Sequence, residues 1–281
     1  MRSLLLAACL LTGACAGTPR DDEFTTAPVV AAERAFAASA AEIGWVKAFR
    51  RFVAPDGMLV QPEPVNAPQS LAETEDRGDR GLAWWPVYAG IARSGDFGFT
   101  TGPFSVGDRP VGGHYFTVWR KQPDGTWKWI FDGGPAVRDP APIARDGEPG
   151  ALPVAARGLG SAEAAVAAVR AIETANADDA AILAYMAGDV RVNRSREAPG
   201  VGRPAAAAAY ARPAGSVRYS LVRADGSAAG DMVFTLADVR WAGAEGERGG
   251  HAGRIWQLRP EGWRIVYDQL TLRPPPPIAT P

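Results

Sequence analysis

Four blocks of residues occur twice in this sequence, in the same order and at nearly the same separation. The two copies of each block lie between 135 and 137 residues apart. A repeat with so long a period predicts two whole domains in tandem, because the repeats of solenoid proteins are much shorter. The paired blocks are Gly95–Thr100 with Gly230–Thr235, Gly112–His114 with Gly249–His251, Val118–Trp119 with Ile255–Trp256, and Gly125–Asp132 with Glu261–Asp268.

The segment between the copies has the composition of an interdomain linker. Residues 133–160 are rich in Pro, Gly and Ala and show neither helical nor strand periodicity. A loop of this length is uncommon inside one compact domain. We therefore predict a first domain at residues 29–134, a linker at 135–160, a second domain at 161–272 and a Pro-rich tail without a fold of its own at 273–281.

Each copy begins with helical periodicity and ends with strands. Apolar residues recur at helical spacing from Phe36 to Phe52 and from Val166 to Met186. Trp84–Tyr88 predicts a short helix with Pro86 in its first turn. Helices followed by antiparallel strands indicate the α+β class. The predicted strands are Phe97–Thr101, Tyr115–Lys121 and Trp127–Asp132 in the first copy and Met232–Val239, Arg254–Leu258 and Trp263–Gln269 in the second.

The first sixteen residues have the layout of a signal peptide. Arg2 precedes an apolar run that is too short to span a bilayer, and small residues follow it. The residues before Cys15 resemble a bacterial lipobox, in which that cysteine would be lipidated; a lipobox at Cys9 and ordinary cleavage after Ala16 are the alternatives. We expect an exported protein on the periplasmic side of the cell envelope, anchored in the membrane by lipid at Cys15, with residues 17–28 as a polar tether.

The composition argues against several other classes of protein. The formal net charge is −1, so we expect no nucleic-acid partner. Cys9 and Cys15 are the only cysteines, so the mature fold has no disulfide available. The two histidines fall in different copies and no H-x-x-H or C-x-x-C spacing occurs, so we expect neither a metal nor a cofactor.

The first copy resembles a known family. Its last hairpin, with Gly113–Tyr115, Val118–Lys121, Asp124-Gly125 and Trp127–Asp132, is similar to that of the SnoaL-like branch of the nuclear transport factor 2-like superfamily, which includes ketosteroid isomerase. The stretch Glu33–Gly57 is similar to that branch as well. The resemblance implies two cone-shaped domains, each with N-terminal helices packed on a strongly curved antiparallel sheet. It leaves the activity open, because the superfamily holds enzymes, binding domains and scaffolds.

The resemblance also implies an apolar ligand pocket between the helices and the sheet. Six of the nine tryptophans lie in the first copy. Core packing is the default role of buried aromatic residues, but this surplus is enough to line a pocket for a small apolar ligand. The predicted pocket residues are Trp45, Phe49, Trp84, Trp85, Phe99 and Trp129.

Four residues are candidates for acid–base chemistry. A mechanism like that of ketosteroid isomerase would use Asp132 as the base and Tyr88 or Tyr115 as the hydrogen-bond donor, and His114 is a second candidate base. Strand alternation argues against Asp132, because it places this residue on the face opposite Trp129. The alternatives are that Asp132 caps a turn and that His114 is structural.

Two further aspartates, Asp96 and Asp231, follow glycine in the repeated Gly-Asp pair, and we expect both to be turn residues.

These observations favour a binding protein over an enzyme. We expect a non-catalytic module for a small apolar ligand or a partner, with a SnoaL-like or ketosteroid isomerase-like enzyme acting on a hydrophobic carbonyl compound as the alternative. Family members often dimerise through the sheet, so the resemblance further implies that the two domains pair as an internal pseudo-dimer.

Overall fold

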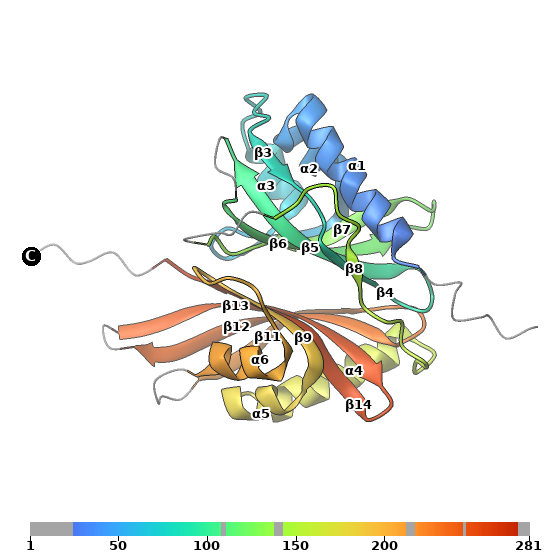
Figure 1. The fold of residues 1–281 in the computed structure, drawn as a ribbon, viewed down its shortest axis with the longest axis vertical. Coiled ribbons are helices and arrows are strands. Elements are labelled where there is room, and N and C mark those ends of the chain that lie inside the picture. Colours follow the sequence, from blue (N-terminus) through green and yellow to red (C-terminus); the bar gives the residue numbers. More distant parts are fainter. Residues whose placement is uncertain (1–24, 108–110, 138–142, 212–216, 244–245, 275–281) are drawn as a thin grey trace, which may run out of the picture.

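The computed structural model describes residues 25–107, 111–137, 143–211, 217–243 and 246–274. It contains two separate β-sheets, each covered by its own helices, which confirms the α+β class (Figure 1). Cys15, the signal segment and the tail after Pro274 lie outside the described residues. Within the described part of the chain, no helix is long and apolar enough to cross a membrane.

The first domain packs three helices on an eight-stranded sheet. The strand order is β2-β1-β7-β6-β5-β4-β8, with β3 also paired to β5. Its elements are α1 (Ala27–Ile43), α2 (Trp45–Phe52), β1 (Val53–Val60), β2 (Pro64–Asn66), α3 (Ala67–Glu73), β3 (Leu82–Trp84), β4 (Tyr88–Ile91), β5 (Phe97–Val106), β6 (Gly113–Lys121), β7 (Trp127–Gly133) and β8 (Gly150–Ala151).

The second domain repeats this arrangement with a six-stranded sheet. The strand order is β10-β9-β14-β13-β12-β11. In both domains the first long strand lies parallel to the last long strand, β1 beside β7 and β9 beside β14. Its elements are α4 (Ala162–Ala175), α5 (Asp179–Ala184), β9 (Met186–Arg194), β10 (Gly200–Val201), α6 (Gly202–Tyr210), β11 (Arg218–Gly226), β12 (Met232–Gly243), β13 (Gly246–Arg259) and β14 (Gly262–Leu272).

Three segments differ in detail from the sequence analysis. The expected helix at Trp84–Tyr88 is instead the junction of β3 and β4, because the backbone N–H groups of Trp85 and Val87 bond carbonyls of β5. Helix α1 begins at Ala27, inside the expected tether. The segment expected to be a linker contains β8, which pairs with β4.

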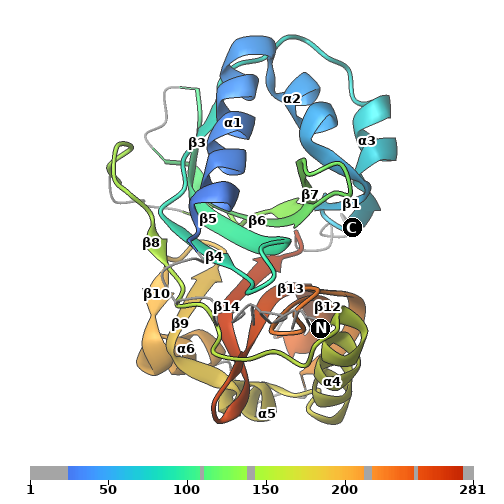
Figure 2. The same ribbon diagram turned by 90° about the vertical axis from the view of Figure 1, so that its right-hand side faces the viewer.

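The two sheets face one another, and the helices lie on their outer sides (Figures 1 and 2). Aromatic rings fill the space between them. The ring of Phe116 lies 4.4 Å from that of Tyr267 and 6.0 Å from that of Phe234. One hydrophobic cluster therefore includes buried residues of both domains, whereas a second cluster lies under the helices of the first domain.

The repeated Gly-Asp pairs connect the domains to one another. A carboxylate oxygen of Asp96 accepts a hydrogen bond from the backbone N–H of Ala228, at 3.1 Å. Asp231 accepts one from the N–H of Arg93, at 3.0 Å. Arg93 and Ala228 occupy equivalent positions in the two copies. Each turn aspartate thus also accepts a hydrogen bond from the backbone of the equivalent turn in the other domain.

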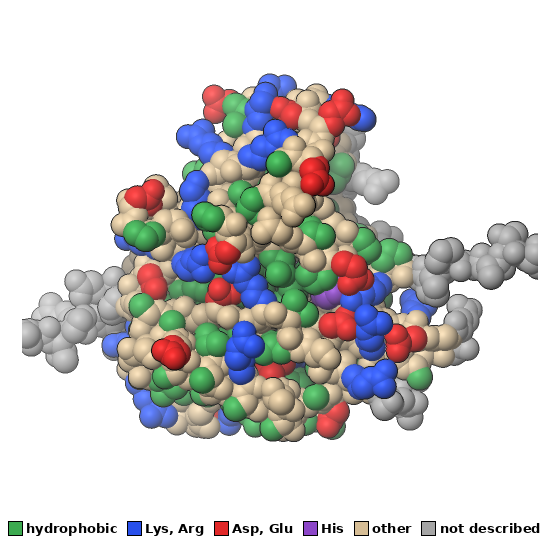
Figure 3. Space-filling view, turned by 180° about the vertical axis from the view of Figure 1, so that it is seen from behind, with side chains coloured by type: hydrophobic (Ala, Val, Ile, Leu, Met, Phe, Trp, Pro, Cys, Tyr) green, Lys and Arg blue, Asp and Glu red, His purple; other side chains and the backbone are tan. Residues whose placement is uncertain are grey.

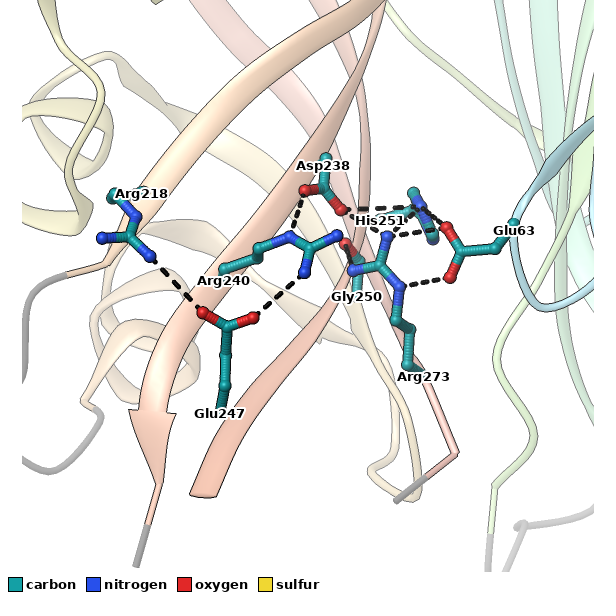
Figure 4. Close-up of polar contacts among 8 residues, drawn as sticks. All are labelled: Glu63, Arg218, Asp238, Arg240, Glu247, Gly250, His251 and Arg273. Carbon is teal, nitrogen blue, oxygen red and sulfur yellow. Dashed lines mark hydrogen bonds and ion pairs between the residues drawn. The ribbon is translucent and has the colours of Figure 1, made fainter. Parts of the chain in front are cut away.

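Charged side chains gather along the boundary between the domains (Figure 3). Near the end of β14, Glu63 of the first domain forms an ion pair with Arg273 and lies 3.3 Å from Nε2 of His251, as Figure 4 shows. Arg273 is also paired with Asp238. On a different part of the boundary, Asp56 forms an ion pair with Arg223 of the second domain at 2.9 Å.

Candidate functional site

A cavity of about 210 Å³ lies in the first domain, between its helices and the face of the sheet that they cover. Aromatic and apolar side chains make most of its wall, and one carboxyl and one phenol reach it. The lining residues are Phe49, Leu82, Trp84, Phe104, Tyr115, Asp132, Gly133 and Gly134. This composition suits a small apolar molecule that carries a polar group.

A β-bulge brings Asp132 to this cavity. Val118 of β6 pairs with Phe131, but the next residue, Trp119, pairs with Trp129, so Ile130 is an extra residue in β7. A bulge of this kind changes the face on which the following side chains lie. Trp129 therefore packs under the helices, 5.8 Å from Phe49, and Asp132 lies on the same side. The placement expected from strict alternation is wrong for this reason.

Asp132 is held in a setting that favours its protonated form. Burial raises its pKa to about 7, although a hydrogen bond from Oγ1 of Thr117, at 2.6 Å, acts in the opposite direction. The nearby carboxyl of Glu33 raises the pKa of Asp132 further. Near neutral pH this group can therefore either donate or accept a hydrogen bond.

Glu33, on α1, is a second buried carboxyl beside the cavity. Its side chain is 0% exposed and accepts hydrogen bonds from Nε1 of Trp84 at 2.6 Å and Nε1 of Trp119 at 3.0 Å. Oγ1 of Thr100 donates to it as well. Burial raises the pKa of Glu33, and the donors named here are all neutral.

Tyr115 contributes a buried, neutral phenol beside the cavity. Tyr115 lines the cavity, and among the described residues its buried OH has no hydrogen-bond partner. Burial, with a contribution from Glu33, raises the pKa of this phenol well above its usual value. A phenol can donate or accept a hydrogen bond, so Tyr115 adds a polar residue to an otherwise largely apolar wall.

His114 lies on the other face of β6. It precedes Tyr115, which lines the cavity, so the two side chains point to opposite sides of the sheet. Neither ring nitrogen has a partner within the described residues. Burial lowers the pKa of His114 to about 4, so the ring is neutral at physiological pH. The structure therefore does not place His114 with Asp132 and Tyr115.

The six predicted pocket residues have different positions. Phe49 and Trp84 line the cavity. Trp45 and Trp129 pack against Phe49, in the layer behind the wall. The ring of Trp85 stacks with Arg145 instead. Phe99 is on the opposite face of the sheet, 5.7 Å from Tyr267 of the second domain, because residues of β5 alternate and Thr100 takes the inner side.

The equivalent place in the second domain is occupied by an arginine. Arg254 pairs across the sheet with Thr235 and Asp268, just as Thr117 pairs with Thr100 and Asp132. The side chain of Arg254 is fully buried and donates to Glu173 at 2.7 Å and to Asp268 at 2.9 Å. The two domains thus share a framework but differ in charge at its centre.

Asp268 is consequently ionised near neutral pH, where Asp132 is partly protonated. Arg194 and Tyr210 also contact it, at 2.5 Å and 3.1 Å. Burial alone would raise the pKa of Asp268, but Arg194 and Arg254 outweigh it and hold the pKa below its usual value. This network makes the centre of the second domain a structural core.

Sequence reasoning missed Glu33, Glu173 and Arg254. The two glutamates do carry a signal, because each falls at helical spacing on an apolar face, with Val29 and Phe36 around Glu33 and Val169 before Glu173. Glu173 accepts hydrogen bonds from Thr235 and Trp256, as Glu33 does from Thr100 and Trp119. Arg254 had no such signal, since a charged residue in a strand usually faces solvent.

Similar solved structures are each about as long as one domain. An NTF2-like protein of unknown function from Pseudomonas putida is 13% identical, with a TM-score of 0.33, over 42% of this chain and 93% of that one. A ketosteroid isomerase-like protein from Erwinia carotovora atroseptica is also 13% identical, with a TM-score of 0.33, over 40% and 96%. A putative calcium/calmodulin-dependent protein kinase type II association domain from Thiobacillus denitrificans is 24% identical, with a TM-score of 0.30, over 42% and 98%. No family model and no curated protein matches the sequence.

Proposed function

We propose that the first domain binds a small, largely apolar molecule with one polar group, and that the second domain is its structural partner. The observation that carries the proposal is the difference between equivalent centres. The first domain has a cavity with aromatic walls, a carboxyl and an unpartnered phenol. The second has Arg254 buried between two carboxylates at that position.

The pairing of the two domains as an internal pseudo-dimer is part of this proposal. Reciprocal contacts support it, because equivalent residues exchange roles across a two-fold relation. Phe99 contacts Tyr267 at 5.7 Å, and the equivalent pair, Phe234 and Phe131, lies at 4.9 Å. In such a pair the second domain covers the outer face of the sheet that carries the site.

Filling the cavity tests the binding function. We expect 2-acetylnaphthalene, a neutral two-ring ketone, to bind and to quench tryptophan fluorescence, since Trp84 lines the cavity. Leu82→Trp places a large ring in the cavity wall and should weaken binding by about tenfold or more. The matched control is Leu159→Trp, at a side chain that is 45% exposed and outside the lining. Equal binding by both variants would contradict the proposed site.

One observation favours an enzyme as the second candidate. Asp132, with a pKa of about 7, lines the same cavity as Tyr115, and a base that acts together with a neutral donor can remove a proton next to a carbonyl group. The test is loss of deuterium from the CD3 group of labelled 2-acetylnaphthalene in ordinary water. Exchange that Asp132→Asn abolishes would identify a proton-abstracting enzyme. Deuterium loss no faster than in buffer would contradict the enzyme, and binding would remain the proposed function.

A further inference from the structure

The two domains differ in whether cations contact the equivalent carboxyls Asp132 of β7 and Asp268 of β14. In the second domain Arg254 and Arg194 both bind Asp268. Thr117 stands at the Arg254 position of the first domain, as the strand register shows. Leu59 and Val192 lie beside the two aspartates; two residues further along, Arg194 is still within β9, whereas Gln61 lies beyond the end of β1 and accepts a hydrogen bond from Ser70. The Arg254 position is therefore neutral in the first domain, and within the described residues no arginine pairs with Asp132 as Arg194 does with Asp268.

The remaining parts of the arginine site are present in the first domain. The Arg254 guanidinium lies 4.6 Å from the ring centre of Tyr219. Tyr219 pairs with Val239 on the neighbouring strand, as Trp84 pairs with Phe104, so Trp84 occupies the equivalent position. A carboxyl and an aromatic ring thus flank a cation in the second domain, and the same two kinds of group line an open cavity in the first.

We propose that the polar group of the ligand is a cation, an amine or guanidinium on an apolar body, which lies between the carboxylate of Asp132 and the ring of Trp84. The inference rests on the binding function proposed above and specifies its ligand. Tryptophan gives the strongest cation–π attraction among aromatic side chains, and a desolvated site increases it. Phe49, Phe104 and Leu82 would contact the apolar body.

The charges around Asp132 are consistent with this ligand. The titratable groups that face it are Glu33 of α1 and Tyr115 of β6. Within the described part of the chain, neither Asp132 nor Glu33 forms an ion pair with lysine or arginine, whereas Glu173 and Asp268 both do. A bound cation would supply the positive charge that the second domain carries within its own chain, and it would favour the ionised form of Asp132.

A matched pair of probes tests the proposal with the full chain. 1-Naphthylmethylamine and 1-naphthalenemethanol have nearly the same shape and differ in charge. By calorimetry at pH 8 we expect the amine to bind about tenfold or more tightly than the alcohol. Asp132→Asn should reduce this preference to nearly none while the alcohol still binds. Asp124→Asn, an exposed change in the β6–β7 turn, should retain the preference.

The pH dependence and a second variant make the test sharper. Below about pH 7 the proton on Asp132 competes with the amine, so amine affinity should fall by up to about tenfold per pH unit while alcohol affinity changes little. Thr117→Arg installs the arginine of the second domain and should abolish the amine preference, with an increase in Tm. If this variant does not fold, Asp132→Asn decides alone.

The outcomes separate this inference from the binding function. Equal affinity for amine and alcohol, or an amine preference that persists in Asp132→Asn, would overturn the cationic ligand while 2-acetylnaphthalene binding stands. If the ketone, the amine and the alcohol all fail to bind, the cavity is not a ligand site and both proposals fall.

Discussion

Replacing Arg254 by methionine is expected to lower the free energy of unfolding by about 3–5 kcal/mol, because it leaves two buried carboxylates without this cation. Glu173 loses the guanidinium 2.7 Å away, and Asp268 keeps Arg194 as its only cation, with the hydroxyl of Tyr210 beside it. A methionine fills a similar volume, so the loss reports charge more than packing. Urea denaturation at pH 8 measures the change.

The sign of the pH dependence distinguishes this explanation from a packing defect. The pKa of Asp268 lies below its ordinary value, so its contribution to stability is present above about pH 4 and is lost as pH falls through the folded pKa. The difference between Arg254→Met and the native chain should therefore shrink in acid. Arg218→Met, at a side chain that is 71% exposed, is the control and should change stability by less than about 0.5 kcal/mol. A loss that is the same at pH 8 and in acid would contradict the electrostatic account.

Phe116→Ala is expected to have a comparable effect and to separate the unfolding of the two domains. Phe116 is 0% exposed, and its ring contacts both Tyr267 and Phe234 of the second domain. Removing a buried phenylalanine ring costs about 3–5 kcal/mol. Because that ring lies between the two sheets, its loss should turn one cooperative transition into two, which calorimetric unfolding detects.

The control for this variant is on the other face of the same sheet. Phe104 lines the cavity of the first domain and makes no ring contact with the second domain among the described residues. Phe104→Ala should weaken the first domain while the transitions remain coupled. If Phe116→Ala also leaves a single transition, the rings between the sheets do not couple the domains and the pseudo-dimer proposal loses its main support.

The sequence predicted the larger features of the fold well. Repeated blocks predicted two copies, and the structure has two separate sheets with the same strand arrangement. The Asp124-Gly125 turn predicted the β6–β7 hairpin, where Gly125 has a φ of 84°. These features depend on local residue types, so one sequence is enough to recognise them.

The candidate site was predicted only in part. Phe49, Trp84, Asp132 and Tyr115 were all named from the sequence and all line one cavity. Their arrangement could not be read from spacing, because the bulge at Ile130 reverses the face on which Asp132 lies. A bulge depends on how two strands pair and leaves no clear pattern within one of them.

The sequence by itself thus determined that the chain has two copies of one α+β domain and that aromatic residues are concentrated in the first. Only the tertiary structure decided what the two centres can do. Thr117 and Arg254 occupy equivalent positions in their strands, and one is a neutral residue where the other is a cation. The side chains that surround each of them come from distant parts of the sequence. Burial favours the neutral form of a carboxyl, and a guanidinium within hydrogen-bond distance favours the ionised form. Which of these acts on Asp132 or Asp268 depends on neighbours that only folding brings together.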